Sequence, residues 1–436
     1  MKSRTCLSLQ QMNLKSLYAV ALFISSAVAA PTRGIYEGDA VYQFEVSNEE
    51  QRSLIASLFK DHTLGLDAWT KLRIGTVDIH VPSKSDKVVL SKLAALKKTV
   101  LIKNLQTVID EEANYSAVNK EKLASNVDNK DLSLEQQAAN LFSDYQDADT
   151  YQSFLLSLPG VQEIVLGTTY EKRTIRGVKF GAGPKNIFLL GGLHAREWIS
   201  PAATTYITNF LLGSDPRAVQ LREQFTFHTV PVSNPDGYAF TRKSGGQRMW
   251  RKNREPNPGY SCIGTDPNRN FDSHWGDTVG ASDYPCADDY FGKGPASTAE
   301  AAAVSNYLKS LTNTVSFVDL HSFAQEWTFP YGFTCDAQAP YFDDLNKASQ
   351  LAVASVKTVD GRTFEYGQSC TRLYPTTGST DDYALDVLKI KYSYTVELRP
   401  TGSSGGGFAL PASQIVVASK ETLEGLITLW QYVATH

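Results

Sequence analysis

An excess of charge and long apolar runs are both missing from this chain. Its 436 residues carry 42 Lys and Arg against 46 Asp and Glu, a formal net charge of −4, and no long basic run stands out. We therefore expect no nucleic-acid partner and no membrane partner, because both favour clustered positive charge. After residue 30, no segment is apolar over the roughly 20 residues that a membrane-spanning helix needs. The 42% apolar and 20% charged composition is typical of a globular protein, and the length allows two domains.

Cysteine is scarce, with five residues in the chain. Cys6 lies in an N-terminal stretch that we expect to be removed, which leaves Cys262, Cys286, Cys335 and Cys370. In an oxidising compartment an even number of this kind indicates two disulfides, with three possible pairings. A tetra-cysteine metal site is the alternative, but the sequence has no C-x-x-C pair of the type that such sites use.

The N-terminus has the composition of a secretory signal peptide. Basic residues up to Lys15 precede an apolar run over residues 17–24, and small residues follow up to Ala29. A cleavage site of the A-x-A type after Ala29 would remove residues 1–29 and export the chain. A transmembrane anchor is the alternative, but the apolar run is shorter than a bilayer requires. We expect a secreted, extracellular protein.

The remaining chain divides into two domains of different pattern. Residues 30–116 contain a strand, helix, strand, helix, strand succession, which indicates a small α+β unit. Residues 117–138 are rich in Asn, Lys, Asp, Ser and Glu, which is typical of a linker, with or without a helical part, that a protease can cut. Residues 139–436 alternate apolar runs with helical stretches, which indicates an α/β fold with a mixed, mainly parallel central sheet flanked by helices. The apolar runs cover residues 187–193, 225–230, 315–320 and 392–396.

Residues with metal-binding chemistry follow two of these apolar runs. The segment GLHAREW over residues 192–198 ends one run and precedes a helix, at the kind of strand-to-helix edge where α/β sheets bind ligands. His194 and Glu197 are three residues apart and can reach one metal ion, and His321 follows the run that ends at Leu320. Two His and one Glu form a catalytic zinc set that leaves a position for water. An H-x-x-E pair alone is more often a hydrogen-bonded pair than a metal site, so its surroundings decide.

Further motifs, in the same order, resemble the A/B-type zinc metallocarboxypeptidases. GLHAREW resembles the first zinc-ligand motif of that family, and the resemblance covers nearly all of residues 139–436. The other matches are MWRKNR at 249–254, DPNRN at 266–270, LHS at 320–322, Tyr374, VELR at 396–399 and LPASQ at 410–414. LDAW at 66–69 and IDEE at 109–112 are similar to that family's activation domain. The resemblance implies a zymogen with a carboxypeptidase-like catalytic domain after an activation domain and a cleavable linker.

The resemblance also implies how the catalytic residues divide the chemistry. His194, Glu197 and His321 would bind one zinc ion per chain. Asp266 would hold the first histidine in position. Glu397 would be the general base that takes a proton from the attacking water.

The substrate would be held by polar residues from other matched motifs. Arg251 would stabilise the oxyanion. Arg269 and Asn268 would bind the free α-carboxylate, for which a guanidinium has the right bidentate geometry. Tyr374 would close over the terminal residue, and Arg196 would lie at an outer subsite. The expected partners are peptides or proteins with a free C-terminus, cut one residue at a time, and an activating protease.

Some features depart from the family or leave its function open. Pro400 and the Gly-rich residues 403–407 differ from the family pattern, and Phe323 lies where many relatives have tyrosine. A catalytically silent binding relative and a zinc amidase are the alternatives; the presence of Glu397 and Arg269 argues against the first. The resemblance further implies a disulfide between Cys262 and Cys286, and the two remaining cysteines, Cys335 and Cys370, would then pair with each other.

The preferred terminal residue depends on one position at the base of the specificity pocket. Counting without gaps from Tyr374 puts Asp381 there, and a buried carboxylate favours C-terminal Lys or Arg because it needs a cationic partner. Ser369 and Gly332 fall on other pocket positions and are small enough for a long side chain. The spacing to Glu397 is one residue longer than usual, and the alternative register with Thr380 at the base favours apolar or aromatic termini. We expect the basic preference.

Overall fold

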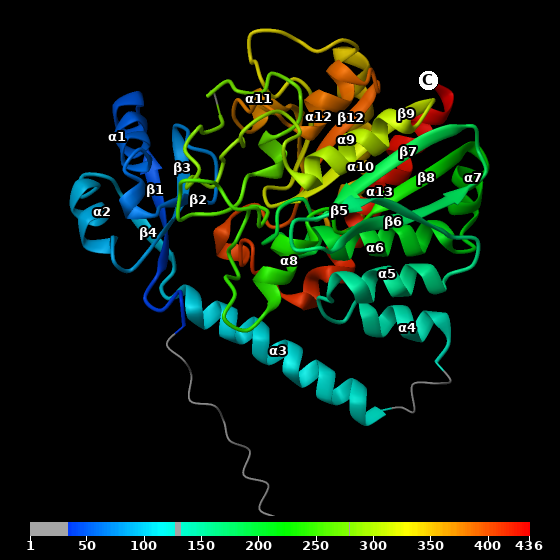
Figure 1. The fold of residues 1–436 in the computed structure, drawn as a ribbon, viewed down its shortest axis with the longest axis horizontal. Coiled ribbons are helices and arrows are strands. Elements are labelled where there is room, and N and C mark those ends of the chain that lie inside the picture. The colour runs from blue at the N-terminus through cyan, green and yellow to red at the C-terminus, as the bar shows by residue number, and fades with distance from the viewer. Residues whose placement is uncertain (1–33, 127–131, 279) are drawn as a thin grey trace, which may run out of the picture. The chain divides into compact units, whose positions relative to one another are not determined.

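The computed structural model describes residues 34–126, 132–278 and 280–436 (Figure 1). Residues 1–29, the expected signal peptide, lie outside this part of the chain. Ile35–His436 form one unit. Within the described ranges, no helix is both long enough and apolar enough to cross a membrane.

An antiparallel sheet with the order β2-β3-β1-β4 forms the N-terminal unit, as the strand and helix pattern predicts. Its strands are β1 (Ala40–Val46), β2 (Asp67–Ala68), β3 (Gly75–Val81) and β4 (Lys98–Ile102). Helices α1 (Glu49–Phe59) and α2 (Asp86–Lys92) and the turn η1 (His62–Leu64) complete it. Alternate strand residues such as Phe44 and Ile79 join Ile55 and Val89 of the helices in one apolar cluster, so the unit has its own core.

A long helix, α3 (Leu105–Asn126), runs from this unit along the larger domain (Figure 1). It crosses the expected boundary between residues 116 and 117, so the first half of the predicted linker is helical. Ser116 Oγ donates to Asp144, and Asn119 Nδ2 donates to the Ser143 carbonyl at 3.1 Å. These contacts hold α3 beside the chain that follows α4 (Leu134–Leu141).

An eight-stranded sheet with the order β11-β10-β12-β9-β7-β8-β6-β5 forms the centre of the larger domain. Its four central strands, β12, β9, β7 and β8, run parallel, while β6 and β5 on one side and the β10–β12 pairing on the other are antiparallel. The mixed, mainly parallel sheet is therefore confirmed. The strands are β5 (Gln162–Thr168), β6 (Thr174–Gly181), β7 (Lys185–Gly191), β8 (Phe225–Val230), β9 (Thr314–Ser322), β10 (Glu326–Phe329), β11 (Glu365–Gln368) and β12 (Tyr392–Leu398).

Both faces of this sheet are buried, which explains why its strands are continuous apolar runs. In β7, Ile187 and Leu189 join one cluster, and Phe188 and Leu190 join another on the opposite face. The first cluster contains residues of α5 (Ala148–Ser157), α6 (Ile199–Leu212), α7 (Pro216–Gln224), α10 (Phe342–Asp360) and α13 (Ile415–Thr435). The second contains α9 (Ala299–Ser310) and the π-helical turn η4 (Tyr383–Val387). Shorter elements are α8 (Pro235–Arg242), η3 (Pro267–Arg269), α11 (Ser369–Arg372), α12 (Thr380–Asp382), η5 (Ser403–Gly405) and η6 (Ala412–Gln414).

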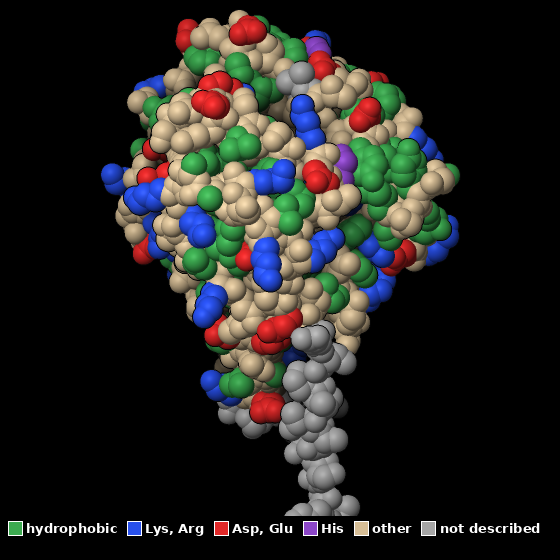
Figure 2. Space-filling view, turned by 90° about the vertical axis from the view of Figure 1, so that its left-hand side faces the viewer, with side chains coloured by type: hydrophobic (Ala, Val, Ile, Leu, Met, Phe, Trp, Pro, Cys, Tyr) green, Lys and Arg blue, Asp and Glu red, His purple; other side chains and the backbone are tan. Residues whose placement is uncertain are grey.

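Two disulfides join loops of the larger domain. Cys262 is bonded to Cys286, and Cys335 is bonded to Cys370, which are the pairs that the family resemblance implies. On the described surface that Figure 2 shows, Lys and Arg side chains lie among acidic and neutral ones and do not merge into one large basic patch.

Candidate active site

The candidate zinc ligands and the candidate base lie at one edge of the central sheet. His194 follows β7, His321 lies near the end of β9, and Glu397 lies near the end of β12. These three strands are parallel neighbours, with Glu397 directly opposite His321 in the β12–β9 register. The carboxyl ends of parallel strands meet at one edge, so the topology brings three distant sequence segments together.

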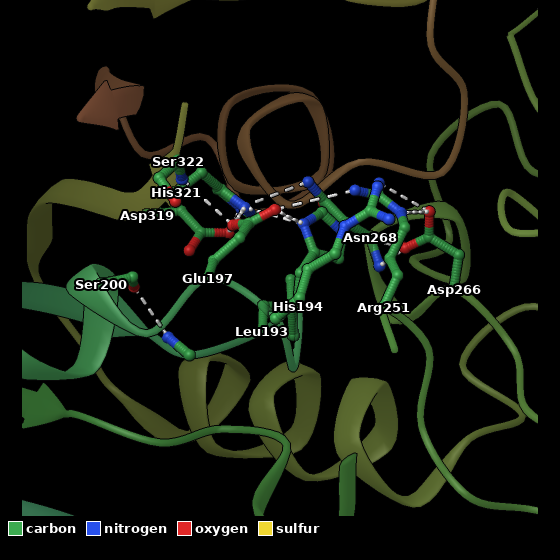
Figure 3. Close-up of polar contacts among 12 residues, drawn as sticks. Leu193, His194, Glu197, Ser200, Arg251, Asp266, Asn268, Asp319, His321 and Ser322 are labelled. Atoms are coloured by element: carbon green, nitrogen blue, oxygen red, sulfur yellow. Dashed lines mark hydrogen bonds and ion pairs between the residues drawn. The ribbon is translucent and has the colours of Figure 1, made fainter. Parts of the chain in front are cut away.

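Local sequence explains how the chain turns from β7 into the site. Gly192 has a φ of +64°, and a Cβ there would lie 2.8 Å from the Pro231 carbonyl oxygen, so a side chain is excluded. Ser200, in the first turn of α6, accepts a hydrogen bond from Gly192 N at 2.9 Å and donates to the Leu320 carbonyl (Figure 3). This hydroxyl joins the chain before His194 to the chain before His321.

The side chains of His194, Glu197 and His321 converge on one point (Figure 3). The two Nδ1 atoms of the histidines are 3.0 Å apart, and Glu197 Oε1 and Oε2 lie 2.8 Å from His194 Nδ1 and 3.0 Å from His321 Nδ1. All three side chains are buried. Lone pairs that converge in this way repel one another unless a cation or protons lie between them.

The second ring nitrogen of each histidine is fixed by its own carboxylate. His194 Nε2 lies 3.0 Å from Asp266 Oδ1, and His321 Nε2 lies 3.0 Å from Asp319 Oδ2. A carboxylate on the outer nitrogen sets the tautomer that leaves Nδ1 free to bind a metal. Asp319 was missed by sequence reasoning, although its position two residues before His321 on one strand puts both side chains on the same face.

This donor set fits zinc. Two imidazole nitrogens and one carboxylate are the ligands of catalytic zinc sites, and both histidines have the supporting carboxylates that such sites use. Burial alone would raise the pKa of the Glu197 carboxyl, but His194 and His321 beside it hold this pKa well below its usual range. Glu197 is therefore ionised and available as a ligand.

Glu397 lies beside this cluster, and one of its carboxylate oxygens accepts no hydrogen bond from the described residues. Its Oε2 is buried and has no hydrogen-bond partner among the described residues. Burial, together with the nearby Glu197 carboxylate, raises the pKa of Glu397 to about 8, although His321 and Arg251 oppose the rise. A carboxylate of raised pKa with a free oxygen is well suited to accept a proton near neutral pH.

Arg251 is held on the other side of the cluster by Asp266. Arg251 Nε and Nη2 donate to Asp266 Oδ2 at 3.0 and 2.8 Å, and its Nη1 lies 3.7 Å from Glu197 Oε1 (Figure 3). Asp266 therefore orients a histidine through one oxygen and an arginine through the other.

Arg269 is a buried cation that has no carboxylate partner within the described ranges. Its Nε donates to the Gly280 carbonyl and its Nη1 to the Asn268 carbonyl, both at 2.8 Å. Its Nη2 lies 3.3 Å from the hydroxyl of Tyr374, a residue that is 39% exposed. The neighbouring Asn268 places its Nδ2 3.4 Å from His321 Nε2. Neutral carbonyls thus fix the guanidinium in place and leave its charge for an anion.

The proposed pocket residues also lie together. Asp381 is buried and accepts hydrogen bonds from Ser369 Oγ at 2.9 Å and Ser379 Oγ at 2.7 Å. Asp382 instead accepts from Gly332 N at 2.8 Å. Thr380 points toward the zinc ligands, because its Oγ1 donates at 2.7 Å to Asp319 Oδ2, the oxygen that lies beside His321 Nε2.

Comparison with known families decides the identity of this arrangement. Residues 152–425 match the family described as zinc carboxypeptidase, and residues 42–112 match the carboxypeptidase activation peptide. The chain belongs to the zinc carboxypeptidase family. Its cofactor is zinc, bound at His194, Glu197 and His321.

Relatives of this carboxypeptidase carry both A-type and B-type names. Carboxypeptidase A2 of Mus musculus is 33% identical over 412 residues, which cover 92% of this chain and 95% of the mouse protein. Carboxypeptidase B of Astacus astacus is 38% identical over 302 residues, which cover 67% of this chain and 98% of the crayfish protein. The crystal structure of thrombin activatable fibrinolysis inhibitor aligns with a TM-score of 0.79 and 26% identity, covering 92% of this chain and all of that one.

The carboxypeptidase carries its activation segment across the outer part of the site. Arg196 contacts the activation segment: its Nη2 donates to Asp67 Oδ1 at 3.2 Å, and Asp67 belongs to β2 of that segment. Trp69, from the same segment, packs edge-on against Phe323 and Phe408. The N-terminal unit and the catalytic domain therefore share an interface at this edge of the site.

A second anchor joins α3 to the catalytic domain. Arg248 donates from Nε and Nη2 to the two carboxylate oxygens of Glu112, at 2.6 and 3.0 Å. Both side chains are largely buried, at 4% and 11% exposure. Arg248 also donates to the Arg196 carbonyl at 2.8 Å, so the two anchors are linked.

Proposed function

We propose that this zinc carboxypeptidase is exported as a zymogen and, once its activation segment is cut away, removes single residues from peptide C-termini, with a preference for Lys and Arg. The expected signal peptide at residues 1–29 and the two disulfides support export, because disulfides persist in oxidising compartments. The proposed activation domain covers residues 30–116, the proposed linker covers residues 117–138, and the proposed catalytic domain covers residues 139–436. The activating cut falls in the linker.

The observation that carries the exopeptidase assignment is the unpaired, buried guanidinium of Arg269. A buried cation is costly unless an anion pairs with it, and the terminal α-carboxylate of a substrate is such an anion. Asn268 adds an amide beside it, and Tyr374 is exposed enough to move over the bound residue. An internal peptide segment has no main-chain carboxylate next to the scissile bond, so a chain end satisfies this arginine best.

The chemistry divides among residues that the fold holds rigidly. When bound, zinc supplies Lewis-acid activation of a water molecule and of the scissile carbonyl. Glu397 takes the proton of the attacking water at its unpartnered Oε2 and later passes it to the leaving amine. Arg251, fixed by Asp266, donates to the oxygen on which negative charge develops. Replacing Glu397 with Gln keeps the shape but removes the base, so we expect turnover to fall by about 100-fold to 10,000-fold.

Asp381 supports the basic preference. Its carboxylate is buried and accepts from two serine hydroxyls and from the Asp382 N–H, which leaves one of its about four acceptor sites for a cationic ligand. The rival pocket residue, Thr380, already donates its hydroxyl to Asp319. Ser369 and Gly332 add little bulk, as a long side chain requires.

The test compares substrates that end in Arg and in Phe. Wild type should prefer Arg, and Asp381→Ala should lower kcat/KM for Arg by about 100-fold or more, because it removes the partner of a desolvated charge. The Phe substrate should change little, and Asp386→Ala serves as a control carboxylate nearby. A wild type that prefers Phe, with the preference unchanged in Asp381→Ala, would contradict the basic assignment and favour an A-type enzyme.

A further inference from the structure

The sequence contains a single N-x-S/T sequon, Asn114-Tyr115-Ser116, and it lies on α3 of the activation segment. We propose that Asn114 is an N-linked glycosylation site and that the glycan leaves with the activation segment when the zymogen is cut. The inference rests on the proposed export, because the modification takes place in the secretory pathway. Two of the relatives, from Mus musculus and Astacus astacus, come from animals, which have this pathway.

The contacts of α3 define which side of the helix faces the protein. Glu112 pairs with Arg248, Ser116 donates to Asp144, and Asn119 donates to the Ser143 carbonyl. These inward residues follow one another at intervals of four and three, which is the spacing of one helix face. The inner face of α3 is apolar at Leu105, Val108 and Ile109, and beyond them it is polar and already occupied.

Asn114 lies on the opposite face. It is exposed, and its carboxamide makes no hydrogen bond within the described residues. Val118 and Glu121 follow it at intervals of four and three, and both are also exposed. A bulky substituent on Asn114 would point away from the catalytic domain and would break none of the contacts of α3.

One apolar side chain lies on the same face within reach of a glycan. Val118, one turn after Asn114, is 48% exposed. Tyr115 is 41% exposed, but as the next residue of the helix it points about 100° away from Asn114. A hydrated oligosaccharide on Asn114 would cover Val118.

The chemistry balances without any residue of the active site. Asn114 Nδ2 attacks the anomeric carbon of an oligosaccharide carried on a lipid pyrophosphate. A nitrogen–carbon bond forms, the bond between that carbon and the pyrophosphate oxygen breaks, the amide loses one proton and the lipid pyrophosphate leaves. Ser116 supplies the sequon hydroxyl before folding and the bond to Asp144 afterwards.

A cut after Lys120 would separate the sugar from the enzyme. Lys120 is exposed and lies on α3 six residues after Asn114, so the glycan would stay on the N-terminal fragment. The mature carboxypeptidase would then be free of N-linked sugar.

The test expresses the full chain in a eukaryotic secretory host as wild type, Asn114→Gln and Ser116→Thr. Intact mass is measured before and after treatment with a peptide N-glycosidase. Wild type and Ser116→Thr, which keeps the sequon and the hydroxyl, should lose the mass of one oligosaccharide, and Asn114→Gln should lose none. After limited trypsin treatment, the sugar should be on the activation fragment alone.

Two different failures are distinguishable. If wild type is secreted with the mass of the unmodified chain, the proposed glycosylation of Asn114 is wrong and the export proposal stands. Chains that stay inside the cell without sugar would overturn both the export proposal and the modification that depends on it.

Discussion

Latency of the zymogen should depend on the ion pair between Glu112 and Arg248, because this pair is buried only while the activation segment is seated. In Glu112→Gln, the Arg248 guanidinium keeps its carbonyl partners but loses its counter-charge. Breaking a buried pair costs about 3 to 5 kcal/mol, and we expect the lower end because glutamine still accepts one hydrogen bond. About 3 kcal/mol corresponds to a shift of about 100-fold toward the open state. Once the segment lifts, water solvates Arg248, so the cost falls on the closed state alone.

The assay measures hydrolysis of a small substrate by the intact chain, with a gel to show that it is uncut. Glu112→Gln should have about 100-fold more activity than wild-type zymogen, up to the ceiling set by the cut enzyme. Glu111→Gln is the matched control, because Glu111 is the exposed neighbour on the same helix. If uncut Glu112→Gln is as inactive as uncut wild type and the control, the Glu112–Arg248 pair does not hold the activation segment in place and the reasoning is wrong.

Two further predictions concern metal and pH. A zinc chelator should abolish activity and lower the melting temperature, because a metal that binds only the native state stabilises that state. Added zinc should restore both. Activity that persists in the chelator would refute the metal assignment. Burial raises the pKa of Glu300 to about 7. The folded state then holds this proton more tightly than the unfolded chain, so stability should fall as pH rises from about 5 to about 8, by up to about 3 kcal/mol. Urea unfolding of wild type and Glu300→Gln at both pH values checks this, and parallel profiles would contradict it.

The zinc ligands could be found from sequence because apolar runs precede His194 and His321 and family motifs surround them; the H-x-x-E pair alone was not enough. Such runs predicted buried parallel strands, and parallel strands bring their carboxyl ends to one edge. His194 and His321 meet there although they are 127 residues apart. Of the two carboxylates that support these histidines, only one was predicted. Asp266 came from a family motif, whereas Asp319 looked like one more strand residue until its Oδ2 was seen beside His321 Nε2.

The end of α3 could not be predicted because its packing face, apolar at Leu105, Val108 and Ile109, becomes polar from Glu112 onward. Sequence reasoning finds amphipathic helices from a stripe of apolar residues. The inward residues Glu112, Ser116 and Asn119 instead dock through an ion pair and hydrogen bonds. Their polarity made residues from 117 onward resemble a linker. Only the partners on the catalytic domain, Arg248 and Asp144 among them, reveal a docked helix.

The adjacent carboxylates of Asp381 and Asp382 show why sequence register alone left the pocket open. Asp382 uses its oxygens on the backbone N–H groups of Gly332 and Phe333, so it shapes the wall of the proposed pocket. Burial, reinforced by the charge of Asp381, raises the pKa of Asp382 well above its usual range. Two ionised carboxylates side by side in a buried pocket repel each other, which disfavours a double negative charge there. A single negative charge shared by this pair would match the single positive charge of a terminal Lys or Arg.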